Sequence, residues 1–81
     1  MEKTAEQMLQ DAKQQISAGE LFQAVATLTQ AVMAYPDCAD AYLERGRLLL
    51  SMGDKAGATK DMIEVARLRP EMITGHFTNQ K

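Results

Sequence analysis

Two copies of one residue pattern, 34 positions apart, constrain the fold of this chain more than any other feature. The matched pairs are Gly19 and Gly53, Glu20 and Asp54, Ala24 and Ala58, Leu28 and Met62, and Pro36 and Pro70. Internal periods of about 20–50 residues are typical of arrays in which one supersecondary unit is repeated. The sequence therefore predicts two copies of such a unit.

Apolar residues recur at intervals of three and four within each copy, which indicates amphipathic helices. In the first copy these residues are Met8, Leu9, Ala12 and Ile16. Thr4 followed by Gln7 matches a capping box, so we expect the first helix to begin near Thr4. Gly19 favours the left-handed conformation that closes a helix, which places the end of this helix near Ala18.

Three further helices are expected over residues 20–34, 39–51 and 55–68. Pro36 and Pro70 stop the second and the fourth helix, because proline lacks the backbone N–H that a helix needs. Asp54 is the expected N-cap of the fourth helix. Beyond Pro70, the apolar residues Ile73 and Phe77 favour one more short helix in the tail.

The composition agrees with helices and narrows the range of partners. The 81 residues, enough for one small domain, are 46% hydrophobic, with six Met, two Tyr, two Phe and no Trp. This selection favours helices over strands. The net charge of −2 argues against nucleic acid as a ligand, because neutralising phosphates needs a basic surface. No apolar run approaches the roughly 20 residues of a membrane span, and none follows Met1 as in a signal peptide.

The chain contains no combination of residues that indicates catalysis. Cys38 is the only cysteine, which excludes an internal disulfide and a cysteine-based metal site. A lone thiol fits a reducing compartment, so the expected location is the cytoplasm. His76, the only histidine, has no acid within four positions and is not a candidate general base. We therefore expect no catalytic residue, no cofactor and no metal.

Further matches at the same offset place large and small residues at equivalent points of the two copies. Met8 and Tyr42 are large residues near the start, and Ala12 and Gly46 are small residues four positions later. With the glycine–acid turn and the closing proline, this pattern resembles the tetratricopeptide repeat. In that family the small residues let the two helices of a unit approach closely.

The resemblance implies an all-α fold of two tandem helix-turn-helix units, forming a superhelix, with a short C-terminal capping helix. Gln15 and Leu49 depart from the family, which usually has an aromatic residue there, and Val65 fills an alanine position that Ala31 matches. The implied divisions are an N-terminal lead over 1–4, repeat 1 over 5–38, repeat 2 over 39–72, and a tail or partial capping helix over 73–81.

One ion pair is predicted inside the second unit. Arg45 is expected to face the second helix of its unit, and Asp61 lies on that helix near the level of Gly46. We therefore hypothesise an Arg45–Asp61 pair, with Asp11, the counterpart of Arg45 in the first unit, as a further partner. The alternative is that each side chain points into water, where such a pair contributes at most about 1 kcal/mol.

The resemblance also implies a groove lined by the first helix of each repeat, which in this family takes an extended peptide or a partner helix. The groove residues it assigns are Glu6, Leu9, Lys13, Ile16, Asp40, Leu43, Arg47 and Leu50. A mixed polar and apolar wall suits peptide recognition. Glu44 argues against the terminal carboxylate that chaperone-binding members of the family clamp, because it would repel that group.

The sequence thus predicts a non-catalytic protein-interaction module, an adaptor or scaffold that binds a protein or peptide. Two repeats leave the outer side of the last helix without a complete neighbour. The apolar residues expected on that side are Met62, Val65, Ala66 and Leu68. Either the tail covers it with Met72, Ile73 and Phe77, or a second copy does, which would make the chain a homodimerisation module. A longer natural protein and, ranked last, an accessory fragment of an enzyme are the remaining alternatives.

Overall fold

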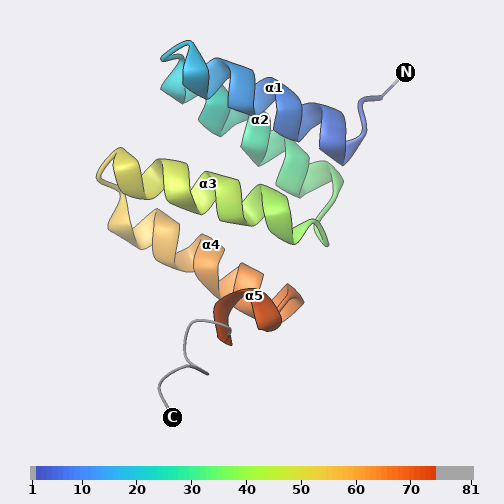
Figure 1. Ribbon diagram of the computed structural model, residues 1–81, viewed down its shortest axis with the longest axis vertical. Helices are drawn as coiled ribbons and strands as arrows, with labels where there is room; N and C mark the ends of the chain where they lie inside the picture. Colours follow the sequence, from blue (N-terminus) through green and yellow to red (C-terminus); the bar gives the residue numbers. More distant parts are fainter. Residues whose placement is uncertain (1, 75–81) are drawn as a thin grey trace.

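The computed structural model describes residues 2–74, and this part of the chain is all-α (Figure 1). Its four long helices are α1 (Ala5–Ser17), α2 (Leu21–Ala34), α3 (Ala39–Ser51) and α4 (Lys55–Leu68), and one short turn, α5 (Glu71–Thr74), follows them. No strand occurs among the described residues. The all-α prediction is therefore confirmed, and the expected bounds of the long helices agree with the structure to within a residue.

Glycines and prolines end the helices as the sequence predicts. Gly19 and Gly53 follow α1 and α3 with φ of +79° and +92°, a conformation that glycine adopts at little cost. Tyr35 and Arg69, the C-cap residues of α2 and α4, have ψ of 73° and 75°. Each precedes a proline, which disfavours the helical conformation of the residue before it.

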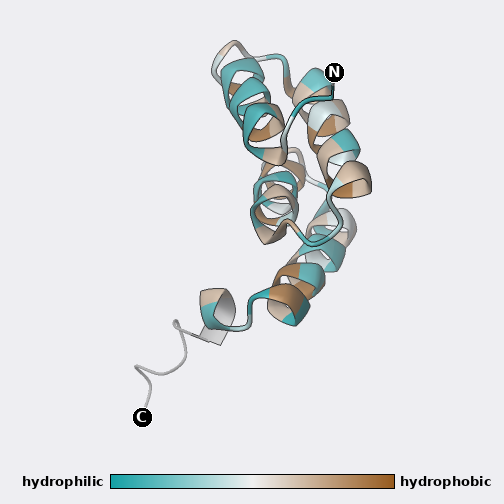
Figure 2. Cartoon of the chain, turned by 90° about the vertical axis from the view of Figure 1, so that its right-hand side faces the viewer, coloured by the Kyte–Doolittle hydropathy of each residue, from teal (hydrophilic) through white to brown (hydrophobic). Residues whose placement is uncertain are grey.

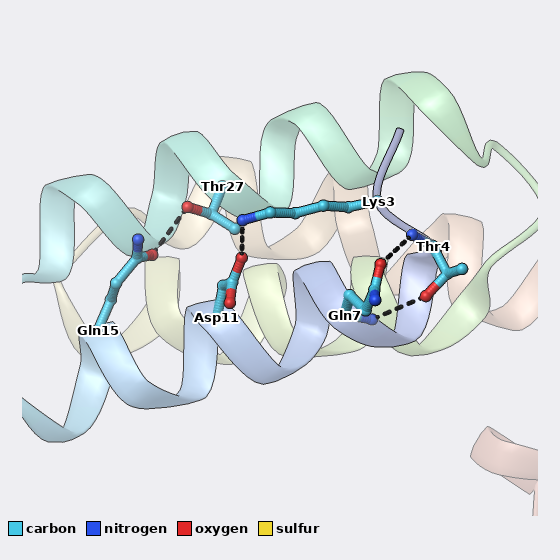
Figure 3. Close-up of polar contacts among 6 residues, drawn as sticks. All are labelled: Lys3, Thr4, Gln7, Asp11, Gln15 and Thr27. Carbon is cyan, nitrogen blue, oxygen red and sulfur yellow. Dashed lines mark hydrogen bonds and ion pairs between the residues drawn. The ribbon is translucent and has the colours of Figure 1, made fainter. Parts of the chain in front are cut away.

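Only the two outermost long helices have N-caps formed by a side chain. Thr4 Oγ1 accepts from the Gln7 backbone N–H, and Gln7 Oε1 accepts from that of Thr4, which confirms the predicted capping box of α1 (Figure 3). Asp54 caps α4 by accepting from the Gly57 N–H at 2.8 Å, also as predicted. The N-cap residues of α2 and α3, Glu20 and Cys38, make no such bond.

Each long helix packs mainly against its neighbours in the sequence: α1 on α2, α2 on α3, and α3 on α4. We call the α1–α2 pair hairpin 1 and the α3–α4 pair hairpin 2. In Figure 2, α1 and α3 lie on one side of the molecule, and α2 and α4 lie on the other. The inner helices α2 and α3 are thus held between neighbours, whereas α1 and the outer side of α4 border the ends of the stack.

The core lies between these two layers and is built largely from small residues. One cluster of buried residues consists of Ala12, Ala24, Leu28 and Leu48, and a second consists of Ala31, Val32 and Ala41. Alanine at a helix crossing lets the two axes approach closely. Each cluster contains residues of both hairpins, and α3 supplies the members from hairpin 2, so the two hairpins pack against each other through α3.

One prediction for the outer side of α4 is wrong. Val65 is fully buried, because it occupies the same core position in hairpin 2 that the fully buried Ala31 occupies in hairpin 1. The large apolar residue that α4 exposes is instead Ile63, whose relative exposure is 59%. Met72 of α5 is partly buried. The predictions for His76 and Phe77 concern residues outside those that the structure describes.

Candidate binding surface

Arg45 connects three helices at the centre of the stack. Its Nε and Nη2 donate to the two carboxylate oxygens of Asp61 on α4 at 2.8 and 2.7 Å, and its Nη1 donates to Thr29 Oγ1 on α2 at 3.3 Å. Its guanidinium carbon lies 5.9 Å from the centre of the Tyr42 ring, within reach of a cation–π contact. The hydrogen bonds to Asp61 raise the pKa of Arg45 above its ordinary value.

The predicted Arg45–Asp61 pair is therefore confirmed, and its role is structural. The Asp61 side chain is only 4% exposed, and no buried side-chain nitrogen or oxygen in the described part of the chain lacks a hydrogen-bond partner. A carboxylate this deeply buried is tolerated because both of its oxygens accept charged hydrogen bonds. The pair holds the two helices of hairpin 2 together, and the Thr29 contact ties hairpin 2 to hairpin 1.

Asp11 does not join this pair, so that part of the prediction is wrong. Figure 3 shows Lys3, which precedes α1, reaching Asp11 and forming an ion pair with it. Hairpin 1 is connected instead by a neutral bond, in which Thr27 Oγ1 donates to Gln15 Oε1 at 2.8 Å. Sequence reasoning missed this bond, because Gln15 stood out only as a departure from the repeat.

The eight predicted groove residues all come from α1 and α3, the two helices on one side of the stack (Figure 2). The four charged members are exposed: Glu6, Lys13, Asp40 and Arg47. Of the apolar members, Leu9 and Ile16 are partly buried and pack against the core, and Leu43 is partly buried. Leu50 is 57% exposed. The face is therefore a charged surface in which apolar side chains are partly accessible.

Ile16 and Arg47 are the two predicted groove residues that the structure brings together across the hairpins. They line a hollow of about 220 Å³ together with Glu44, Leu48 and Ser51 of α3. Leu48 is almost fully buried, so the apolar part of the hollow is fixed by the core. The Ser51 hydroxyl donates to the Leu48 carbonyl at 2.7 Å. This hollow combines an apolar wall with side chains of both charges.

Other predicted groove residues lie elsewhere. Lys13 borders a shallow hollow formed by α1 and the residue after it, and Leu50 borders a hollow on α4. Sequence reasoning assigned Leu50 to the same groove as Ile16, its counterpart 34 positions earlier. The structure separates them, because the hollow at Ile16 is closed by the next hairpin and the hollow at Leu50 is not.

Cys38 is a free, partly buried thiol at the N-cap of α3. Among residues 2–74 no three His, Cys, Asp or Glu side chains come together as metal ligands. None of the helices in this range has both the length and the hydrophobicity needed to cross a membrane.

Comparison with known proteins adds no relative. No protein-family model, no curated protein and no solved structure matches the chain.

Proposed function

We propose that the chain is a tetratricopeptide-type, non-catalytic interaction module that binds a peptide or protein segment across α1 and α3. The observation that carries this proposal is the hollow shared by Ile16 of hairpin 1 and Arg47 of hairpin 2. A ligand seated there would contact both repeats at once. The repeat period, the glycine turns and the closing prolines support the family. A cytoplasmic adaptor or scaffold is the role we assign to it.

The lining of this hollow indicates the kind of ligand. Ile16 and Leu48 offer apolar contact, and Arg47 and Glu44 offer charges of opposite sign at the same place. An extended segment with one apolar anchor and neighbouring polar groups matches this lining. A terminal carboxylate does not, because Glu44 would oppose the attraction of Arg47.

A peptide library displayed on phage and selected against the full chain tests this proposal. Peptides selected on the wild type should lose most of their affinity for Arg47→Glu, which reverses the charge beside the hollow, and for Ile16→Asp. Lys60→Glu is the matched control, since Lys60 is an exposed cation on α4, in the other layer. Selected peptides that bind Arg47→Glu and the wild type equally well would contradict the proposed surface.

A further inference from the structure

The outer side of α4 carries a second hollow, of about 470 Å³, which we call the end hollow. Leu50 of α3 forms one wall, and residues along one side of α4 form the rest. Two residues of the end hollow are large, apolar and exposed: the relative exposure is 57% for Leu50 and 59% for Ile63. Apolar side chains gathered in this way at a chain surface are typical of interaction sites.

The repeat identifies what this hollow corresponds to in hairpin 1. Five residues of the end hollow stand 34 positions after residues that form or border the core cluster containing Leu48. The pairs are Ile16 and Leu50, Leu21 and Lys55, Ala24 and Ala58, Val25 and Thr59, and Leu28 and Met62. The end hollow is therefore the equivalent, on hairpin 2, of the surface of hairpin 1 on which α3 packs.

The contact between α3 and hairpin 1 shows what such a surface accepts. Leu48 of α3 is 5% exposed and belongs to the same cluster as Leu28. Seven positions earlier, two helical turns away, Ala41 is fully buried in the cluster with Ala31 and Val32. The surface of hairpin 1 thus binds a helix that presents alanine and leucine on one face, seven residues apart.

We propose that the end hollow binds an amphipathic helix supplied by another polypeptide, antiparallel to α4. This helix carries a leucine that enters the hollow and a small residue two turns before it. The proposal rests on an interface that the structure already contains. The surface of α2 that α3 covers has its equivalent on α4. Recognition of an amphipathic helix through such spaced anchors is a common mode of protein association.

The charge of the end hollow adds a requirement on the C-terminal end of the helix that binds there. Lys55 replaces Leu21 at its edge, and this is the one charged residue of the lining. Leu21 begins α2 and packs near the C-terminal end of the antiparallel α3. A helix on α4 would therefore place its C-terminal end beside Lys55. Lysine interacts favourably with the carbonyls of a helix C-terminus and with an acid in its last turn.

A second copy of this chain does not fit the same description. In a head-to-tail contact, α1 of the second copy would take the place of α3, and it has Gln7 and Gln14 at the positions of Ala41 and Leu48. Both glutamines are exposed. Two end hollows facing each other would bring together two concave surfaces without filling either one.

The probe for this proposal is a peptide of residues 37–53, which contains α3, with Cys38→Ser and blocked ends. Fluorescence anisotropy should show saturable binding of the labelled peptide to the full chain. The affinity should fall at least about tenfold when the peptide carries Leu48→Gln or the chain carries Ile63→Glu. Phe22→Glu is the matched control, because Phe22 is an apolar residue on α2 with a relative exposure of 83%. This variant should leave binding unchanged.

Three additional measurements test the proposal further. A peptide of residues 3–19, which contains α1, should not bind, because its corresponding face carries glutamines. Lys55→Glu in the chain should weaken binding of the α3 peptide, because it places an acid beside the C-terminal end of the bound helix. Arg47→Glu in the chain should leave binding of the α3 peptide unchanged. The proposal for the end hollow and the proposal for the surface across α1 and α3 can therefore be refuted separately.

Three outcomes would overturn the proposal. The first is peptide binding that Ile63→Glu does not weaken while circular dichroism shows that this variant is folded. The second is equal binding of the α1 and α3 peptides. The third is a dimer in sedimentation equilibrium that Ile63→Glu abolishes, since the occupant of the end hollow would then be a second copy.

Discussion

Hairpin 1 and hairpin 2 have helices of the same lengths, 13 and 14 residues, yet different polar groups connect the two helices of each. In hairpin 1 the connection is the neutral bond between Thr27 and Gln15, where both side chains are partly buried. In hairpin 2 it is the ion pair between Arg45 and Asp61. The repeat therefore fixes where the helices lie and leaves the connecting chemistry free to differ.

The position of each hairpin in the stack gives a physical reason for this difference. Arg45 also donates a hydrogen bond to Thr29 of hairpin 1. Its guanidinium therefore connects the two hairpins to each other and also connects the two helices of hairpin 2. Asp11, at the equivalent position of α1, pairs instead with Lys3 near the surface. A buried charge is stable only where enough partners surround it.

The largest effect is expected for Arg45→Met, which leaves the Asp61 carboxylate buried without its partner. We expect a loss of about 4 kcal/mol in the free energy of unfolding, since breaking a buried pair from one side is strongly destabilising. Urea denaturation at pH 7 measures it. Arg45→Met combined with Asp61→Leu should recover much of the loss, and a loss no larger than that of an exposed pair would contradict the structural role assigned to Arg45.

Both matched alanines are buried, and enlarging them should distinguish the position that α3 covers from the position that borders the end hollow. Ala24→Leu is expected to cost about 3 kcal/mol, because Ala24 is fully buried beneath α3. Ala58→Leu should cost about 1 kcal/mol, because Ala58 borders the end hollow and the added atoms can enter it. Thermal melting of both variants gives the comparison. Equal losses would show that the end hollow gives no room to the larger side chain.

A smaller effect is expected from Thr27→Val, which removes the donor of the hydrogen bond to Gln15. The expected loss is about 1 kcal/mol, the usual net value of one neutral hydrogen bond, because Gln15 remains partly accessible to water. Chemical denaturation under the conditions used for Arg45→Met allows a direct comparison. A loss as large as that of Arg45→Met would mean that the two connections are equally important.

The smallest effect is expected at the N-cap of α2, and it should be stabilising. Glu20 and Asp54 occupy equivalent N-cap positions with similar dihedral angles, φ of −90° and −92° and ψ of 68° and 82°, but only Asp54 accepts a backbone N–H. Glu20→Asp should therefore add a cap and about 0.5 kcal/mol of stability. Asp54→Glu is the reciprocal variant and should lose a similar amount. An unchanged melting temperature for both would contradict this reading of the caps.

The helices and their ends could be predicted from the sequence, because the determinants are local. Gly19 and Gly53 allow the backbone to turn, and Pro36 and Pro70 prevent the helix from continuing. Arg45 and Asp61 could be paired because the repeat fixed the relation between their helices. Each of these inferences needs only the spacing of residues along the chain.

The arrangement of the surface could not be predicted in the same way. The ion pair of Asp11 with Lys3 depends on the path of the segment before α1, which has no periodic pattern. Ile16 and Leu50 are equivalent in sequence, and they differ in exposure because one of them has a hairpin packed beside it and the other does not. Periodicity places residues on a helix face, but it does not tell which face a later part of the chain will cover.

Contacts that join consecutive helices also bear on how the chain folds. Each helix finds its principal partner within about one repeat of sequence, so little loop-closure entropy opposes any single contact, and folding is expected to be fast. Local contacts of this kind also let the molecule fold without first bringing distant parts of the chain together.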